Sequence, residues 1–162
     1  MGVTRAEFMR GRARRPRPPW ALAEREFIGR CTRCGECSSS CPAGILVRGA
    51  GGYPEVDFTH GGCTFCAACV RICATGALRW IEAAPAWNLR AVICATRCLA
   101  SRAVVCRGCG DACEADAISF RPGPAGIGFP AVDWFACTGC GACVPVCPVQ
   151  AVTAAERRRE AA

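Results

Sequence analysis

Cysteine is the residue that most constrains what this chain can fold into, because it recurs at fixed short intervals. Three cysteine groups have the spacing CxxCxxCxxxC, and the remaining group has the same ending but seven residues instead of two between its first and second cysteines. In chain order the groups are Cys31, Cys34, Cys37 and Cys41; Cys63, Cys66, Cys69 and Cys73; Cys98, Cys106, Cys109 and Cys113; and Cys137, Cys140, Cys143 and Cys147. The recurrence indicates one structural unit that is repeated along the chain.

This spacing suits a cubane cluster better than zinc or disulfides. Three thiolates at intervals of three residues wrap a single loop around one cube, each on a different iron. A zinc site pairs two separate CxxC knuckles and does not need a third cysteine at the next interval. Disulfides between such close neighbours would be strained. The pattern therefore predicts four 4Fe-4S clusters, and at least three if the stretched third group, which is the weakest match, is left out.

The fourth cysteine of a group cannot easily close back onto its own cube. In bacterial two-cluster ferredoxins it ligates the partner cluster, and the same crossing predicts four ligand sets here. Set one is Cys31, Cys34, Cys37 and Cys73; set two is Cys63, Cys66, Cys69 and Cys41; set three is Cys98, Cys106, Cys109 and Cys147; set four is Cys137, Cys140, Cys143 and Cys113.

A few other residues near the groups need an interpretation. Cys94 is the cysteine left over, and we expect a small buried apolar thiol there, with replacement of Cys98 as the alternative. His60 has no obvious partner and is expected to be structural or exposed. Glycines near the groups are expected to let backbone N–H groups point at the clusters. We find no catalytic constellation and predict that the protein is not an enzyme.

The repeats also predict the domain organisation. After each last cysteine comes a short turn and a small strand, and a similar lead-in, Tyr53–Phe58 and Phe129–Trp134, precedes the second and fourth groups. We expect an α+β fold with two bacterial-ferredoxin-like modules, made of short strands and helices around paired clusters. The predicted segments are an irregular Arg/Pro-rich arm (1–27), module one (28–82), a connector with a strand (83–97), module two (98–153) and a charged helical tail (154–162).

The formal net charge is +7, and all the positive charge comes from arginine. Each oxidised cluster with its thiolates carries roughly −2, so the loaded protein is near neutral and nucleic-acid binding is not expected. The sequence lacks a run of about 20 apolar residues, and we expect no membrane span. The pair Arg14-Arg15 is followed by prolines and charged residues instead of an apolar stretch, so we expect a cytoplasmic protein rather than an exported one.

Five features together resemble one family. They are Arg17-Pro-Pro-Trp20, Cys31-Thr-Arg-Cys34, Arg48-Gly-Ala-Gly-Gly-Tyr-Pro54, the displaced third group, and the closing Cys137-Thr-Gly-Cys-Gly-Ala-Cys143. In these features the chain is similar to the NapF family, the ferredoxin-type accessory proteins of the periplasmic nitrate reductase system. The cysteine spacing alone is shared by all bacterial ferredoxins.

The resemblance implies a partner and a role. The partner is the catalytic subunit of periplasmic nitrate reductase in its precursor form, and the role is to assist maturation of that subunit in the cytoplasm before export, by redox or iron–sulfur chemistry. The Arg/Pro-rich arm with Trp20 is then a candidate docking element. The alternative function is an electron-transfer ferredoxin or an electron-wiring subunit of an oxidoreductase.

Overall fold

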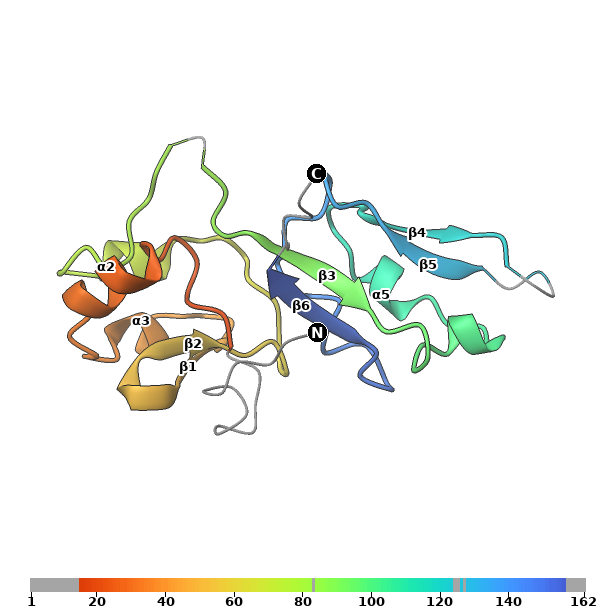
Figure 1. Cartoon of the computed structure of the whole chain (residues 1–162), viewed down its shortest axis with the longest axis horizontal. Coiled ribbons are helices and arrows are strands. Elements are labelled where there is room, and N and C mark those ends of the chain that lie inside the picture. The colour runs from red at the N-terminus through yellow and green to blue at the C-terminus, as the bar shows by residue number, and fades with distance from the viewer. Residues whose placement is uncertain (1–14, 83, 124–125, 127, 157–162) are drawn as a thin grey trace.

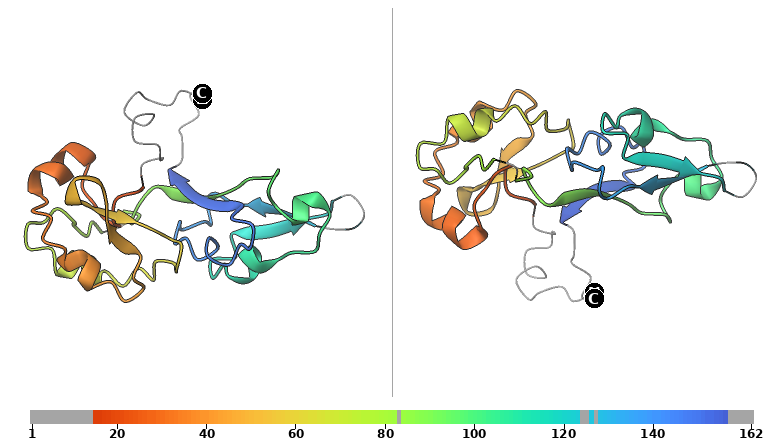
Figure 2. Two further views of the ribbon diagram at one scale, coloured as in Figure 1. Left: turned by 90° about the horizontal axis from the view of Figure 1, so that it is seen from below. Right: turned by 90° about the horizontal axis from the view of Figure 1, so that it is seen from above.

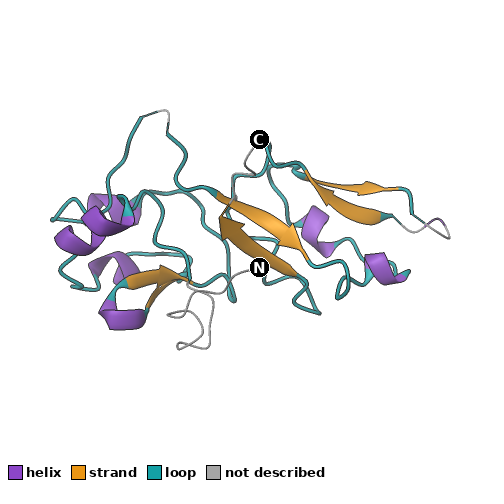
Figure 3. Ribbon diagram, in the orientation of Figure 1, coloured by secondary structure: helices purple, strands orange, loops and turns teal. Residues whose placement is uncertain are grey.

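The computed structural model describes residues 15–82, 84–123, 126 and 128–156. These residues form short helices and two-stranded antiparallel sheets, in agreement with the predicted α+β class. Figure 1 shows an elongated molecule with strands and short helices in each half, and Figure 3 separates the helices from the strands. The elements are α2 (Glu24–Arg30), α3 (Glu36–Ser39), β1 (Leu46–Arg48), η1 (Ala50–Gly52), β2 (Pro54–Val56), α4 (Ala68–Arg71), β3 (Leu89–Ile93), η2 (Ala100–Arg102), α5 (Gly108–Asp111), β4 (Ile118–Arg121), β5 (Phe129–Val132) and β6 (Val152–Glu156).

The same turn follows all four cysteine groups. The third residue after each last cysteine has a positive φ, and its N–H donates to the carbonyl oxygen of that cysteine; these residues are Gly44, Gly76, Asp116 and Gln150. Two positions further on lies a buried apolar residue that begins a strand or a bridge; these are Leu46, Leu78, Ile118 and Val152. The predicted turn and strand are therefore present after every group, although the strand after the second group is reduced to a single bridge.

The two predicted lead-in segments form equivalent hairpins. β1 pairs with β2 and β4 pairs with β5, both antiparallel. The equivalent partners are Leu46 opposite Val56 and Ile118 opposite Val132. Just after each lead-in strand a backbone hydrogen bond closes the hairpin, from Asp57 to Ile45 at 2.8 Å and from Asp133 to Ala117 at 2.7 Å. The duplication read from the sequence is thus a duplication of hairpin register as well.

Residues 15–27 correct the predicted irregular arm, because they pack onto module one. Ala21 bridges to Leu78 after the second group, and β3 of the connector pairs with β6 after the fourth group in the equivalent place. Trp20 is 7% exposed and Phe27 is fully buried. The arm and the connector therefore have the same role, since each supplies the partner for the last strand position of a module.

The arm is irregular only in its proline-rich part. The prolines from Pro16 to Pro19 precede a helix, α2, that has Glu24 and Glu26 in its first turn and Arg30 in its last, which suits the helix dipole. Arg17 forms an ion pair with Glu24 at 2.9 Å and lies over the Phe27 ring, 5.1 Å from its centroid. Those two contacts lie within the arm, but Arg17 also reaches module one, 3.8 Å from the Glu55 carboxylate and 3.3 Å from the carbonyl oxygen of Pro54. Local composition does not reveal these contacts.

The two modules differ in their cores. The core of module one contains large aromatic side chains, with Trp20, Phe27 and Phe58 buried and Tyr53 and Phe65 packed against them. In module two and the connector strand the buried residues of the core are aliphatic or are cysteines, namely Ala91, Ala117, Ile118, Cys137, Cys143 and Val152. Figure 2 shows the two modules side by side from below and from above. The second module has much less apolar side-chain volume with which to fold.

Some predictions fall at the edges of the described chain. The first part of the arm, residues 1–14, and the predicted helical tail from 157 lie outside the described residues. β6 continues to Glu156, beyond the predicted end of module two at 153. In the described ranges we find no helix that combines the length and the apolar character needed to cross a membrane.

Candidate iron–sulfur sites

Three of the four predicted ligand sets line one hollow each. Set two, Cys41 with Cys63, Cys66 and Cys69, lines a hollow of about 340 Å³. Set three, Cys98 with Cys106, Cys109 and Cys147, lines one of about 350 Å³. Set four, Cys113 with Cys137, Cys140 and Cys143, lines one of about 380 Å³. In each case the crossed cysteine from the other group faces the hollow together with three cysteines of one loop.

Set one has fewer contacts that bring its four cysteines together. Cys31, Cys37 and Cys73 pack against the same core, and Cys34 is exposed beside them. Burial raises the pKa of Cys37, and the nearby Cys31 and Cys34 thiolates raise it further. The N–H of Leu78 donates to the Sγ of Cys73 at 3.4 Å. The described hollows do not include one for this set, so its geometry rests on these contacts.

The regular loops share a backbone conformation around their second cysteine. In the first, second and fourth groups the residues on both sides of that cysteine have positive φ; the pairs are Arg33 and Gly35, Phe65 and Ala67, and Gly139 and Gly141. Left-handed residues turn the chain sharply, which lets one short loop present its thiols around a common centre. Gly35 and Gly141 follow the second cysteine at equivalent positions, and glycine adopts this conformation without strain.

The third cysteine of a group lies on a one-turn helix, in α3, α4 and α5 for the first three groups. In the first group the helix is closed by the Ser39 N–H, which donates to the carbonyl oxygen of Gly35 at 3.1 Å. The equivalent position in the fourth group is Pro145, which has no N–H to donate. The fourth group accordingly forms turns there instead of a helix.

The stretched third group keeps its first cysteine at the hollow. The inserted residues form the short helix η2 and a left-handed turn at Ala103. Cys98 is buried and lines the hollow of set three, and its thiolate is among the charges that raise the pKa of Cys109. The insertion bulges outward, because Val105, just before Cys106, is 78% exposed.

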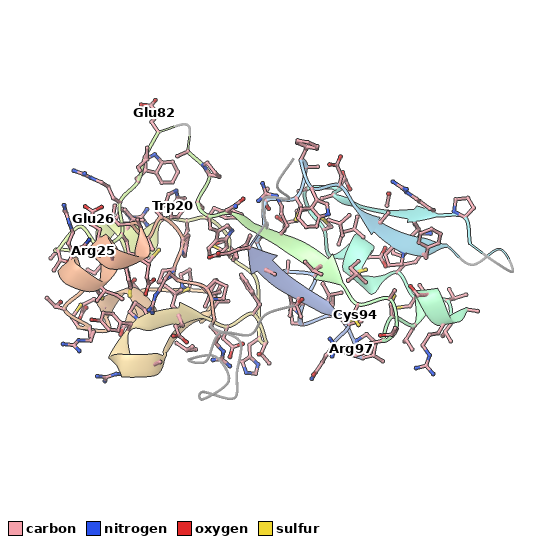
Figure 4. All side chains as sticks on the ribbon, viewed as in Figure 1. Trp20, Arg25, Glu26, Glu82, Cys94 and Arg97 are labelled. Carbon is pink, nitrogen blue, oxygen red and sulfur yellow. The ribbon has the colours of Figure 1, made fainter. Side chains whose placement is uncertain are left out.

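Cys94 contradicts the prediction of a buried apolar thiol. It directly follows β3 and is partly exposed, and it does not line the hollow of set three. Its Sγ lies 3.2 Å from the Thr96 hydroxyl oxygen, and Figure 4 shows Arg97 beside it. Hydrogen bonds from Thr96 and then Arg97 lower the pKa of the Cys94 thiol to about 7. In the repeat Cys94 occupies the position of Leu22. The N–H of Cys94 donates to the carbonyl oxygen of Ala151, and the N–H of Leu22 donates to that of the equivalent Ala77.

Backbone N–H groups reach several of the cysteine sulfurs. Amides donate to the sulfurs of Cys63, Cys73, Cys113, Cys137 and Cys147 at distances from 3.1 to 3.5 Å. The donors are Phe65, Leu78, Ala117, Ala91 and Ala151. These five donors are not glycines, although a backbone hydrogen bond at Gly110 lowers the pKa of Cys109; the predicted role of the glycines at the clusters stays a prediction. Such bonds stabilise negative charge on a thiolate and tune the potential of a bound cluster.

Burial keeps several of these thiols protonated in the absence of metal. Burial, together with the smaller effect of nearby thiolates, raises the pKa of Cys63 and Cys69 to about 11. Cys143 is raised to about 12, again mainly by burial. Cys66 is the exception, since a backbone hydrogen bond at Ala68 lowers its pKa. Metal ligands must be deprotonated, so cluster assembly here releases protons and is favoured by higher pH.

The donor geometry fits a cube better than a single ion. Within the described residues, no three His, Cys, Asp or Glu side chains lie close enough to share one metal ion. A structural zinc needs four ligands about 2.3 Å from one atom, whereas each thiolate of a cubane binds a different iron. His60, predicted to be structural or exposed, is exposed.

Comparisons with known proteins agree with this geometry. Residues 30–78 match one family model described as a 4Fe-4S dicluster domain, and residues 102–151 match another with the same description. The second match begins after Cys98. Two dicluster domains together with the number of cysteines show that the chain carries multiple 4Fe-4S clusters, four when both domains are filled.

Curated relatives cover most of the chain. The ferredoxin-type protein NapF of Escherichia coli K12 is 46% identical over 138 residues, which are 85% of this chain and 83% of that protein. NapF of Haemophilus influenzae is 44% identical over 85% of this chain and 77% of its own length. The methylamine utilization ferredoxin-type protein MauM of Methylobacillus flagellatus is 33% identical over 81% of this chain and 63% of that protein. The chain belongs to the NapF family of ferredoxin-type iron–sulfur proteins.

Proposed function

We propose that sixteen cysteines hold four 4Fe-4S clusters in the crossed sets one to four, and that Cys94 is not a ligand. The observation that supports the assignment best is that sets two, three and four each line one hollow. Iron and acid-labile sulfide on anaerobically purified protein should each be about sixteen per chain. Cys98→Ser should lower both to about twelve, and Cys94→Ser, four residues away, should leave them unchanged. Equal loss in both variants would contradict the assignment of set three.

We further propose that the protein acts in the cytoplasm as a non-enzymatic accessory factor of the periplasmic nitrate reductase system. There it assists maturation of the catalytic subunit before export, by redox or iron–sulfur chemistry. The proposal is supported by the relatives named NapF, which cover most of this chain and most of their own length. The clusters would supply one-electron chemistry, while the chain's residues position the thiolates and exclude solvent.

The docking element implied by the family resemblance needs revision. Trp20 is buried and lines the hollow of set two, so it is not a docking side chain. Deletion of residues 1–27 would remove core residues and test folding instead of binding. The informative deletion removes residues 1–14 only. If docking depends on that segment, this truncated protein should keep its iron and lose its affinity for the unexported catalytic subunit.

The alternative function is electron transfer to or from an oxidoreductase, and the order of addition separates the two. A maturation factor should raise nitrate reductase activity only when it is present before the catalytic subunit is completed. A carrier should be reduced and reoxidised at catalytic rates with the finished enzyme. The experiment uses the loaded full chain, the catalytic subunit produced without it, and the Cys98→Ser variant as a form with altered cluster content. Activity gained after completion would contradict the maturation role.

A further inference from the structure

Modules one and two meet at two cysteine groups. The N–H of Cys63, in the second group, donates to the carbonyl oxygen of Cys140, in the fourth group, over 2.7 Å. Cys63 lines the hollow of set two and Cys140 lines that of set four. A single backbone hydrogen bond therefore joins one proposed ligand residue of each module.

Each module has a glycine where the two modules approach each other most closely. A Cβ on Gly62 would lie 2.8 Å from the backbone nitrogen of Ala142. The φ of Gly62 lies outside the positive range, so the close approach and not the backbone conformation requires glycine there. From the other side, a Cβ on Gly141 would collide with the Phe58 ring. Gly62 therefore lets the backbone of module one lie against Ala142, and Gly141 lets the Phe58 ring of module one pack on the backbone of module two.

We propose that this contact, the junction formed by Gly62, Cys63, Cys140, Gly141 and Ala142, is the electronic connection between the two modules. The proposal rests on the ligand sets given under the proposed function. Electron exchange weakens steeply with distance and passes better through bonded atoms and hydrogen bonds than through a gap. Exchange across the junction would move one electron between the cluster held by set two and the cluster held by set four, with no bond broken and no proton transferred.

The junction determines the order of the four sets. Within module one, α3 and α4 are in contact, and the Cys37 thiolate is among the charges felt by Cys69, which places sets one and two together. Within module two, Cys109 packs in the same core as Cys143, which places sets three and four together. The order along the molecule is therefore one, two, four, three. α3 and the inserted loop of set three lie toward opposite ends of the elongated molecule (Figure 1).

Adjacent glycines provide a matched test on the loaded full chain. In Gly62→Ala and Gly62→Val the new side chain must push module two away. In the control, Gly61→Ala, the new Cβ meets its nearest atom at 3.4 Å, an ordinary contact. Amide hydrogen exchange of Cys63 reports whether the junction is open, and paramagnetic resonance of dithionite-reduced protein reports spin–spin interaction among the clusters. Iron content and the visible spectrum report whether the sets themselves are filled.

In both the native protein and Gly61→Ala we expect the Cys63 amide to be protected from hydrogen exchange. The spin–spin interaction signals of these two proteins should be the same. In Gly62→Val, hydrogen exchange of the Cys63 amide should be about tenfold faster or more. The paramagnetic resonance signals should narrow toward those of two cluster pairs that do not interact with each other. Gly62→Ala should show the same changes with smaller amplitude. Three results would overturn the proposed junction. The first is a Cys63 amide that is unprotected from hydrogen exchange in the native protein, and the second is unchanged hydrogen exchange of that amide in Gly62→Val. The third is faster hydrogen exchange in Gly62→Val with unchanged spin–spin interaction signals. An iron content of the native protein well below about sixteen per chain would instead contradict the ligand sets.

Discussion

Module one packs its two cysteine groups against Trp20, Phe27 and Phe58, whereas module two packs its groups mainly against alanine, valine and isoleucine side chains. The cysteine pattern, the turn after each group and the hairpin register are nevertheless the same in both. Burial of one large aromatic side chain contributes about 2–3 kcal/mol, so module one has a source of stability that module two largely lacks. The comparison indicates that the same ligand pattern can be supported by an apolar core or chiefly by the clusters.

Removal of iron should have the largest effect on the comparison, because the two modules should then differ most in stability. After chelation under oxidising conditions, we expect the Asp133 amide of module two to lose all its protection from hydrogen exchange. The equivalent Asp57 amide of module one should keep part of its protection, because its aromatic core remains. In small zinc domains a structural metal contributes on the order of 10 kcal/mol to folding. Equal loss at both amides would show that the aromatic core does not stabilise module one by itself.

Truncation of the aromatic core should affect the modules in the opposite sense. Phe27→Ala removes a fully buried ring and should lower the free energy of opening at Asp57 by about 3–5 kcal/mol. Asp133 should change little, because its hairpin packs in the other core.

The control for that variant is Phe135→Ala, in module two, where the ring is 87% exposed. Such a surface change should cost less than about 0.5 kcal/mol at either amide. A similar effect of Phe27→Ala on both amides would mean that the two cores unfold as one unit.

The equivalent glycines after the second cysteine of the first and fourth groups allow a finer comparison. Both have positive φ, so alanine introduces a similar backbone strain of about 1–2 kcal/mol at either one. At Gly35 the new Cβ has no atom within 4 Å, whereas at Gly141 it collides with Phe58. Thermal unfolding of the loaded protein should therefore show Gly141→Ala as the less stable variant, by about 1–3 kcal/mol. Equal stability would mean that the modules are not packed closely at Phe58.

The smallest effect on stability is expected at Cys94. Because its pKa is lowered to about 7 by Thr96 and Arg97, the thiolate fraction rises with pH and is half-maximal near pH 7. Iodoacetamide should label one thiol per loaded chain with that pH dependence, and the labelling should disappear in Cys94→Ser. The stability of Cys94→Ser should match the native protein within about 0.5 kcal/mol. A half-maximal rate near pH 9 would contradict the effect of the two neighbours.

Sequence reasoning succeeded where the signal was local. The four turns at Gly44, Gly76, Asp116 and Gln150 follow directly from the repeated residues after each last cysteine, and the connector strand was placed within 83–97. It failed where a distant segment decides the structure. Trp20 and Phe27 were assigned to an irregular arm because prolines dominate that stretch, and only their packing on module one identifies them as core. Cys94 was expected to be buried because a free cysteine usually behaves as a small apolar residue, but it lies between the end of β3 and a turn and is partly exposed.

The cysteine spacing by itself determined the cofactor and indicated the number of clusters, because three thiolates at intervals of three residues let one short loop reach three irons of a cube. The crossed pairing of the groups stays a prediction. The tertiary structure alone decided which segments complete each module and where the modules touch. Ala21 and β3 find their partners only when distant parts of the chain fold together, and Gly62 meets Ala142 only because the two modules pack there. Contacts of that kind depend on the path of the whole chain through space, which local residue patterns do not encode.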